Sequence, residues 1–362
     1  MTPSDTSQPD TSPPPASPPT ASPPTARMAI EAAQAADAAA LQIERCGAGI
    51  KELGERLRRS PPRFVVTCAR GSSDHAAGYG KYLIETHLGR AVASVGPSVA
   101  SVYGTDLDLR DALFIAVSQS GRSPDLLRLT ETARRGGALV VGIVNDETSP
   151  LPDLCDISLP LCAGPEISVA ATKSYILSGL AFLQITAHWS GNEELHRSVA
   201  GLPAALAAAR ELDWSPALDR LAATSSLFVI GRGVGLGAAQ EIALKFKETC
   251  RLHAEAFSSA EVMHGPLALV GPGFPVLALS QDDESAAGSR AVVERLVSLG
   301  AAVMSTAGET GTVPLPVVQG CPAATMPLCM VQSFYMAVHR LAKARGIDPD
   351  APNHLRKITE TM

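Results

Sequence analysis

A hydroxyl-rich turn, Ser118-Gln-Ser120-Gly-Arg-Ser123-Pro-Asp, follows the apolar run 112–117 and has the residue types of an anion-binding site. Pro124 suits the first position of a helix, and Ser123 suits the N-cap. Three hydroxyls and free backbone N–H groups would then surround the positive end of a helix, which favours a bound phosphate. Capping alone explains Ser123 but not Ser118 or Ser120. The chain has neither the Walker lysine spacing nor a GxGxxG motif, so a nucleotide is not favoured.

A second turn, Gly71-Ser72-Ser73-Asp74, follows the apolar run 63–69 and places two more hydroxyls at the start of another predicted helix. The carboxyl ends of parallel strands meet at one edge of a sheet, where open α/β sheets bind their ligands. We therefore expect the two turns to lie together. Many hydroxyls with few fixed charges would suit a small phosphorylated polyol.

Three charged residues, Glu241, Lys245 and Glu248, have a spacing that puts them on one face of a helix. A solvent-exposed stripe of salt bridges is the more common meaning of such spacing. However, the segment that follows is polar and ends with His264 before Gly-Pro, which restricts the backbone there. A carboxylate and an imidazole beside one sugar would supply the two proton carriers needed for ring opening and proton relocation. The pattern leaves both interpretations open.

Short apolar runs alternate with longer helical stretches along most of the chain, which predicts parallel sheets covered by helices on both faces. The pattern restarts after an Ala-rich helical stretch, 200–221. Arg232-Gly lies 162 residues after Arg70-Gly, and each pair stands between an apolar run and two adjacent alanines. We therefore expect two similar doubly wound α/β domains. Their predicted strands lie near 63–69, 91–95, 112–117, 138–144 and 157–161, then near 227–230, 276–279, 302–305 and, more weakly, 324–328.

The chain is predicted to divide into five segments. The first 26 residues are almost all Pro, Ser, Thr, Ala and Asp, so they cannot bury enough apolar surface to offset the entropy of ordering, and they are predicted to be a disordered tail. A helical, Ala-rich pattern follows. The predicted segments are the tail 1–26, an N-terminal helical segment 27–60, the first domain 61–205, the second domain 206–340 and a C-terminal tail 341–362.

The composition excludes several classes of protein. The 362 residues have a formal net charge of −6, whereas a nucleic-acid-binding body would show a clustered basic excess. The seven cysteines include no CxxC pair, which disfavours a disulfide framework or a thiolate zinc site and fits a reducing cytoplasm. We find no secretory leader, no apolar run long enough to span a bilayer and no metal-ligand spacing among the histidines.

Seven stretches of the sequence resemble the double sugar-isomerase (SIS) domain family, and within it the isomerase domain of glucosamine-6-phosphate synthase. They occur in the family's order, and the resemblance covers about 45–362. The matching stretches are 71–76, 118–125, 166–173, 241–248, 253–256, 264–269 and 353–357. The resemblance implies two flavodoxin-like αβα domains, with the C-terminal tail closing over the site.

The resemblance also implies roles for individual residues. Glu248 would move a proton between C1 and C2 of the sugar, assisted by Lys245. His264 would assist ring opening from the neighbouring subunit of a homodimer, and Lys357 on the tail would engage the open-chain carbonyl. The sugar phosphate would be bound by Ser72, Ser73, Ser118, Gln119, Ser120 and Ser123, and the substrate site would include Val169, Ala171 and Glu241.

Several departures from the synthase pattern bear on the expected reaction. A Pro/Ser tail stands where the synthase has its glutamine-hydrolysing domain, and Ala171 stands where it has a serine. Ser72 and Ser123 replace threonines, and Arg122-Ser-Pro replaces Glu-Thr-Ala. These variants resemble the stand-alone SIS-type glucosamine-6-phosphate deaminases. We therefore expect a cytoplasmic enzyme without a cofactor that converts glucosamine 6-phosphate and water into fructose 6-phosphate and ammonia.

Three alternatives stay open. The chain could be a deaminase or deglycase for another amino sugar phosphate, a synthase subunit supplied by a separate amidotransferase, or a non-catalytic sugar-phosphate sensor. Sensors with this fold usually carry a DNA-binding domain, and none is visible. They also need not keep Glu248, His264 and Lys357 together, as this chain does. The expected partners are a sugar phosphate and a second copy of the chain, with no nucleic acid, membrane or metal.

Overall fold

The computed structural model describes residues 26–355 and residue 357, so the predicted tail 1–26 falls almost wholly outside the described residues. The first sheet is built from runs of apolar residues that are buried on both faces. All seven residues of β3 are buried, and its side chains alternate between two separate clusters of core residues. The strands are β1 Phe64–Cys68, β2 Val92–Ser94, β3 Ala112–Ser118, β4 Leu139–Val144 and β5 Ile157–Pro160.

The second sheet repeats the architecture of the first. Its strands are β6 Ser226–Gly231, β7 His253–Ser258, β8 Pro275–Ala278, β9 Ala302–Ser305 and β10 Val313–Pro314. The two sheets have the orders β2-β1-β3-β4-β5 and β10-β9-β8-β6-β7, with every pairing parallel. Counted within each domain, both orders are 2-1-3-4-5, the flavodoxin-like order. The predicted fold class and the predicted duplication are therefore confirmed.

One expectation for the second sheet is wrong, and two of its strands, β7 and β10, are not predicted from the sequence. The weak apolar run 324–328 does not form a strand, because it leads into the long helix Met326–Ala344. Part of the polar segment after Glu248 forms the strand β7, which pairs with β6 at the edge of the sheet. Its first three residues alternate between exposed and buried, as expected of a strand with one face exposed to solvent. His253 and Glu255 are the exposed residues.

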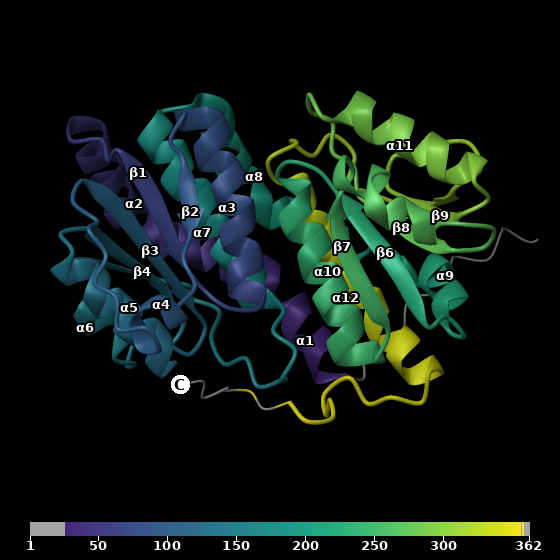
Figure 1. The fold of residues 1–362 in the computed structure, drawn as a ribbon, viewed down its shortest axis with the longest axis horizontal. Coiled ribbons are helices and arrows are strands. Elements are labelled where there is room, and N and C mark those ends of the chain that lie inside the picture. The colour runs from purple at the N-terminus through teal and green to yellow at the C-terminus, as the bar shows by residue number, and fades with distance from the viewer. Residues whose placement is uncertain (1–25, 356, 358–362) are drawn as a thin grey trace, which may run out of the picture.

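Helices cover both faces of each sheet and form a shared layer between the sheets (Figure 1). One cluster of buried residues runs through this shared layer and includes residues from both domains. The outer face of each sheet has a smaller cluster of its own. The helices are α1 Arg27–Ala33, α2 Ala35–Arg59, α3 Ser72–Leu88, α4 Ser98–Ser101, α5 Pro124–Arg135, α6 Leu151–Leu154, α7 Lys173–Ser190, α8 Glu193–Arg210, α9 Ser215–Leu218, α10 Gly235–Cys250, α11 Ala286–Ser298 and α12 Met326–Ala344, with 3₁₀ turns η1 Asp219–Leu221, η2 Glu261–Met263 and η3 Gly265–Leu269.

Helices α3 and α10, one from each domain, pack against each other at the centre of the molecule (Figure 1). Gly237 makes this close approach possible. A Cβ atom at Gly237 would lie 2.6 Å from the carbonyl oxygen of His75 and 2.9 Å from the backbone nitrogen of Tyr79, closer than packed atoms can be. Because Glu241 lies one turn after Gly237, the contact sets this carboxylate beside the start of α3.

Candidate active site

The two hydroxyl-rich turns lie at the same edge of the first sheet, because β1 and β3 are neighbouring parallel strands. A direct contact joins them. Arg70, at the end of β1, donates from Nε to Oδ2 of Asp125, in the first turn of α5, over 2.8 Å. The structure therefore brings Ser72 and Ser73 to the same side of the sheet as the loop 118–123, as the sequence predicts.

The loop 118–123 is tightly folded around its own hydroxyls. Ser118 Oγ accepts the backbone N–H of Gly121 at 2.9 Å, and Ser120 Oγ accepts that of Arg122 at 3.3 Å. Gly121 has φ +62, and a Cβ atom there would lie 2.0 Å from Oγ of Ser149. Both serines act as acceptors within the loop, so each hydroxyl proton is left to donate to an anion.

Helix α5 begins at Pro124 with Ser123 at the N-cap, as predicted. The Ser123 side chain, however, makes no capping hydrogen bond. Ser123 therefore occupies the N-cap position as expected, but its hydroxyl does not cap the helix. Arg122 turns away and pairs with Asp146, with 2.8 Å between Nη2 and Oδ2. The backbone carbonyl oxygen of Gln119 accepts the backbone N–H of Asp146 at 3.3 Å. The Ser123 hydroxyl is therefore unused by the helix.

The charged residues of α10 form a buried cluster at the boundary of the two domains. Lys245 Nζ lies 2.5 Å from Glu248 Oε2, 3.3 Å from Glu241 Oε1 and 3.0 Å from Ser72 Oγ. The side chains of Glu241 and Lys245 are 0% and 1% exposed. The interpretation as a solvent-exposed stripe is therefore wrong for these two residues.

Glu241 is the centre of this cluster and connects three helices. Its Oε1 accepts the Tyr335 hydroxyl of α12 at 2.7 Å and the Ser72 hydroxyl of α3 at 3.2 Å. Its Oε2 lies 3.1 Å from Nδ1 of His75. These contacts hold α10 to the first domain at the turn where a phosphate is expected to bind.

The cluster keeps its charges despite burial. Burial lowers the pKa of the Lys245 ammonium, but the carboxylates of Glu241 and Glu248 outweigh burial and hold that pKa above its ordinary value. Burial raises the pKa of Glu241, but Lys245 and the hydrogen bond with His75 outweigh it and hold that pKa below its ordinary value. Lys245 is therefore a fixed positive charge beside Glu248.

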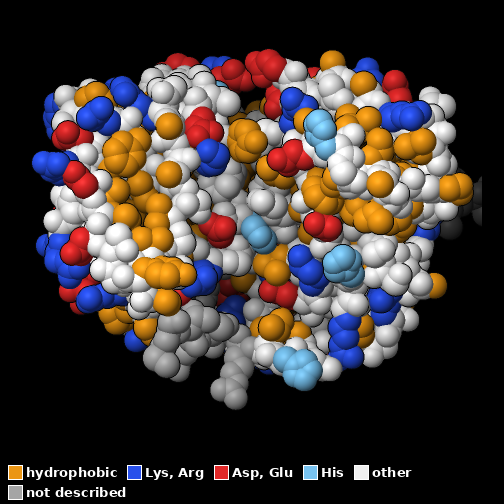
Figure 2. Space-filling model, viewed as in Figure 1, with side chains coloured by type: hydrophobic (Ala, Val, Ile, Leu, Met, Phe, Trp, Pro, Cys, Tyr) orange, Lys and Arg blue, Asp and Glu red, His pale blue; other side chains and the backbone are white. Residues whose placement is uncertain are grey.

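Glu248 is the member of the cluster that a substrate can reach. Its side chain is 18% exposed, against 1% for Lys245, and it lies in the last turn of α10. Figure 2 shows acidic and His side chains along the seam where the two domains meet. A carboxylate held by a rigid helix, paired with a buried cation and open on one side, has the properties of a general base.

Lys357 contacts the loop before α7 and not the α10 cluster. Its Nζ donates to the carbonyl oxygen of Ser168 at 2.7 Å and lies 3.5 Å from Oε2 of Glu166. Val169 and Ala171, both half-buried, belong to this same loop. The structure therefore brings the C-terminal tail onto the loop that carries two of the predicted substrate residues.

His264 is separate from the other predicted residues. It is exposed at the turn between η2 and η3, and within the described part of the chain its imidazole makes no hydrogen bond or ion pair. It is not joined to Glu248, so a single chain does not assemble the predicted pair of proton carriers.

Sequence reasoning missed three polar residues that organise the site. Tyr335 has no signal around it, because it lies in an apolar helix. His75 stands three residues after the start of α3, where only the nearby serines mark the turn. Glu166 is buried and accepts the backbone N–H groups of Thr172 and Ser174, at 3.0 and 3.1 Å, which fixes the loop before α7.

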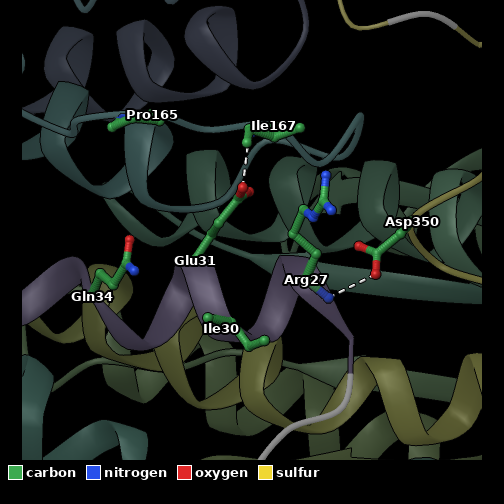
Figure 3. A pocket seen from close by; sticks show the side chains of 7 residues that line it. All are labelled: Arg27, Ile30, Glu31, Gln34, Pro165, Ile167 and Asp350. Carbon is green, nitrogen blue, oxygen red and sulfur yellow. Dashed lines mark hydrogen bonds between the residues drawn. The ribbon is translucent and has the colours of Figure 1, made fainter.

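A separate cavity of about 580 Å³ lies between α1, the loop before α7 and the C-terminal segment (Figure 3). Glu31 accepts the backbone N–H of Ile167 at 2.7 Å, and the backbone N–H of Arg27 donates to Asp350 at 2.6 Å. None of the predicted site residues lines this cavity. Both carboxylates at its wall, Glu31 and Asp350, thus already accept backbone N–H groups.

The described residues include neither a candidate metal site nor a candidate membrane span. No group of three or more His, Cys, Asp or Glu side chains in this part of the chain is arranged to hold a metal ion. Across the same residues, no helix has both the length and the apolar character needed to cross a membrane.

Comparison with known proteins gives consistent matches. A family model described as "SIS domain" matches residues 60–187 and 220–312, which contain the two sheets. The glutamine–fructose-6-phosphate aminotransferase [isomerizing] of Aeropyrum pernix is 33% identical over 322 residues, which are 82% of this chain and 50% of that protein. The chain thus spans about half the length of the curated relative.

Two solved structures share the fold. A protein of Silicibacter pomeroyi described as a candidate phosphosugar isomerase is 44% identical, with a TM-score of 0.86 over 90% of this chain and 100% of that chain. A glucosamine-6-phosphate deaminase of Thermotoga maritima is 23% identical, with a TM-score of 0.71 over 92% of this chain and 100% of that chain. With its two matched domains and their shared strand order, this chain belongs to the SIS domain family.

Proposed function

We propose that this chain is an aldose–ketose isomerase of an amino sugar phosphate that releases ammonia, converting glucosamine 6-phosphate and water into fructose 6-phosphate and ammonia. The observation that carries the proposal is the environment of Glu248. Its carboxylate is partly exposed, lies at the boundary of the two domains and is 2.5 Å from the buried ammonium of Lys245. The names of the relatives support the sugar class, since the Aeropyrum pernix protein is an isomerizing aminotransferase of fructose 6-phosphate.

Glu248 would act as the base that moves a proton between two adjacent carbons. One carboxylate can take the proton from C2 and return it to C1 if both carbons present the same face of an open-chain sugar. Lys245 would place a fixed positive charge beside Glu248, at 2.5 Å from its Oε2. The loop 118–123 would hold the phosphate through the unused protons of its hydroxyls and so fix the distance between the phosphate and C2.

Ring opening and carbonyl contact would come from His264 and Lys357. The imidazole of His264 is exposed and without a partner among the described residues, which suits a group that acts in the site of a second subunit. We therefore propose a homodimer in which each subunit supplies His264 to the other. We also assign the enzyme to the cytoplasm, because all seven cysteines are free thiols.

The direction of the reaction follows from mass action. After the proton has moved, the sugar carries an imine at C2. Either water or ammonia can attack this imine carbon. Water is the solvent and free ammonia is dilute, so the imine hydrolyses to the ketose. We therefore expect ammonia release when the chain acts alone on glucosamine 6-phosphate.

The first test measures ammonia and fructose 6-phosphate formed by the purified protein from glucosamine 6-phosphate. Glu248→Gln keeps the size of the side chain but cannot accept a proton. It should lower kcat by about 10²–10⁴-fold with KM largely unchanged. Glu294→Gln, at an exposed position on α11, is the matched control and should leave kcat within a few-fold.

The same assay separates the alternatives. Formation of glucosamine 6-phosphate from fructose 6-phosphate and ammonium, without ammonia release, would favour a synthase subunit. Binding of sugar phosphates without turnover would favour a sensor. A Glu248→Gln variant with near wild-type kcat would remove Glu248 from the mechanism.

A further inference from the structure

Two cysteines that do not belong to the site lie against each other in the second domain. Cys321 is in the loop before α12, and Cys329 is in the first turns of that helix. Their Sγ atoms are 3.8 Å apart, and Cys321 Sγ is also 3.2 Å from the hydroxyl of Thr325. Cys321 is half-buried, whereas Cys329 is 1% exposed. A reagent can therefore reach the first thiol but not the second.

Cys321 forms part of the wall of a cavity of about 350 Å³ between α8 and the loop that precedes α12. Ser198 lines the same cavity, is 2% exposed and has a buried hydroxyl with no hydrogen-bond partner among the described residues. Arg197, an exposed cation, lies at its rim. The cavity thus combines space for a small polar molecule, an unsatisfied hydroxyl and one accessible thiol.

The environment of Cys321 differs from that of the other cysteines. Its hydrogen bond with Cys329 lowers the pKa of Cys321 to about 7, and burial opposes this effect without cancelling it. The pKa of Cys329 is raised by the same hydrogen bond and by burial, so Cys329 keeps its proton. Burial raises the pKa of the remaining five thiols, which are Cys46, Cys68, Cys155, Cys162 and Cys250. Cys321 is therefore the thiol with the most thiolate at neutral pH.

We propose that Cys321 and Cys329 form a peroxide-reactive dithiol, in which a small hydroperoxide enters the cavity and oxidises Cys321, and Cys329 then closes a disulfide. The proposal does not depend on the sugar chemistry. It rests on two thiols in contact, on the exposure of one of them and on the cavity in front of it.

The reaction balances with hydrogen peroxide as the oxidant. The Cys321 thiolate attacks one peroxide oxygen, the O–O bond breaks, and the departing hydroxide takes up a proton to become water, leaving a sulfenic acid. The sulfur of Cys329 then attacks the sulfur of Cys321, the S–O bond breaks, and a second water leaves with the proton of Cys329. Two thiols lose two electrons, and one peroxide becomes two waters. The sulfurs must approach from 3.8 Å to about 2.05 Å, which a loop residue can accommodate.

The experiment exposes the reduced, full-length protein to hydrogen peroxide at neutral pH and counts free thiols by alkylation and mass spectrometry. Trypsin releases both cysteines in one peptide, because 296–340 has no Lys or Arg before its last residue. We expect this peptide to lose two alkylation sites in the wild type and to regain them after reduction. In Cys329→Ser, a sulfenic acid should accumulate at Cys321, where dimedone traps it.

Two comparisons make the assignment specific. Cys155→Ser, a change at another half-buried cysteine, should leave disulfide formation unchanged, whereas Cys321→Ser should abolish it. In the wild type, iodoacetamide should alkylate Cys321 at least tenfold faster than Cys155 at pH 7. The proposal is overturned if both thiols stay free in the wild type, or if Cys155 reacts as fast as Cys321. Neither wild-type measurement depends on a variant that has to fold.

Discussion

At the scale of single residues, Glu241 is a fully buried carboxylate with four polar partners. A carboxylate without solvent contact loses hydration free energy, and the effective penalty in proteins is several kcal/mol per ion. Here one oxygen accepts two hydroxyls, the other faces His75, and Lys245 supplies the opposite charge. Glu241 therefore positions Lys245, and Lys245 in turn contacts Glu248, the base that we propose.

The buried ion pair of Glu241 and Lys245 should make the free energy of unfolding depend on pH. Because the folded-state pKa of Glu241 is lowered, its contribution is present above its ordinary value of 4.5 and is lost as the pH falls through the folded-state pKa. Glu241→Gln should destabilise the protein by about 3–5 kcal/mol at neutral pH, and the gap to wild type should narrow below about pH 4.5. Urea unfolding at several pH values measures this gap. A gap that stays constant down to the acid transition would contradict the argument.

Ser120 gives the second prediction at this scale. Its hydroxyl accepts one backbone N–H and has its proton free, so Ser120→Ala removes a donor to the phosphate. A hydrogen bond to a charged group contributes about 1.5–3 kcal/mol, so KM for the sugar phosphate should rise by about ten- to hundredfold with kcat nearly kept. Ser298→Ala, at an exposed position on α11, is the control. An unchanged KM would put the phosphate elsewhere.

At the scale of elements, the approach of α3 to α10 depends on one glycine. A Cβ at Gly237 would meet backbone atoms of α3, which cannot rotate away as a flexible side chain could. Gly237→Ala should therefore cost about 1–3 kcal/mol of stability and should lower activity by moving Glu241 away from Ser72. Gly47→Ala, inside α2 with no atom near the added Cβ, should instead stabilise by up to about 1 kcal/mol. Equal unfolding midpoints for the two variants would exclude a tight contact at Gly237.

The elements also show what the sequence could predict. Strands such as 112–118 and 139–144 are recognisable because both of their faces are buried, so the apolar run is continuous. The edge strand β7 has one face exposed to solvent, so its sequence alternates polar and apolar residues and resembles a polar loop. Helix α7 is buried almost all round, so it has no amphipathic period to indicate its helical form. These failures occur where the burial of an element depends on neighbours that the local sequence does not specify.

The site divides in the same way. Serines in a turn after a strand, and charges spaced along one helical face, are local patterns, so the phosphate loop and the α10 cluster could be predicted from the residues. Tyr335 could not, because its contact with Glu241 joins residues 94 positions apart through the packing of α12 on α10. The burial of Lys245 likewise depends on the other domain, which supplies Ser72.

At the scale of the whole molecule, a single chain does not bring the proposed base, Glu248, together with the proposed second proton carrier, His264. One core of buried residues joins the two domains, so the boundary that holds Glu248 is a fixed surface and not a loose interface between domains. His264 lies exposed on a turn outside that core. If it acts in the site of a neighbouring subunit, as we propose, the functional unit is larger than the folded unit, and the two can be separated by mixing variants.

Complementation provides that test. His264→Ala and Glu248→Gln should each be nearly inactive as homodimers. Random exchange of their subunits makes half of the dimers heterodimers, and each heterodimer has one site with both residues intact and one with neither, because a two-fold interface pairs His264 of one subunit with Glu248 of the other. Mixing the two unfolded variants in equal amounts and refolding them together should therefore restore about a quarter of the wild-type activity. If His264 acted within its own subunit, every site would lack one of the two residues and the mixture would stay inactive, while size-exclusion chromatography would still show dimers.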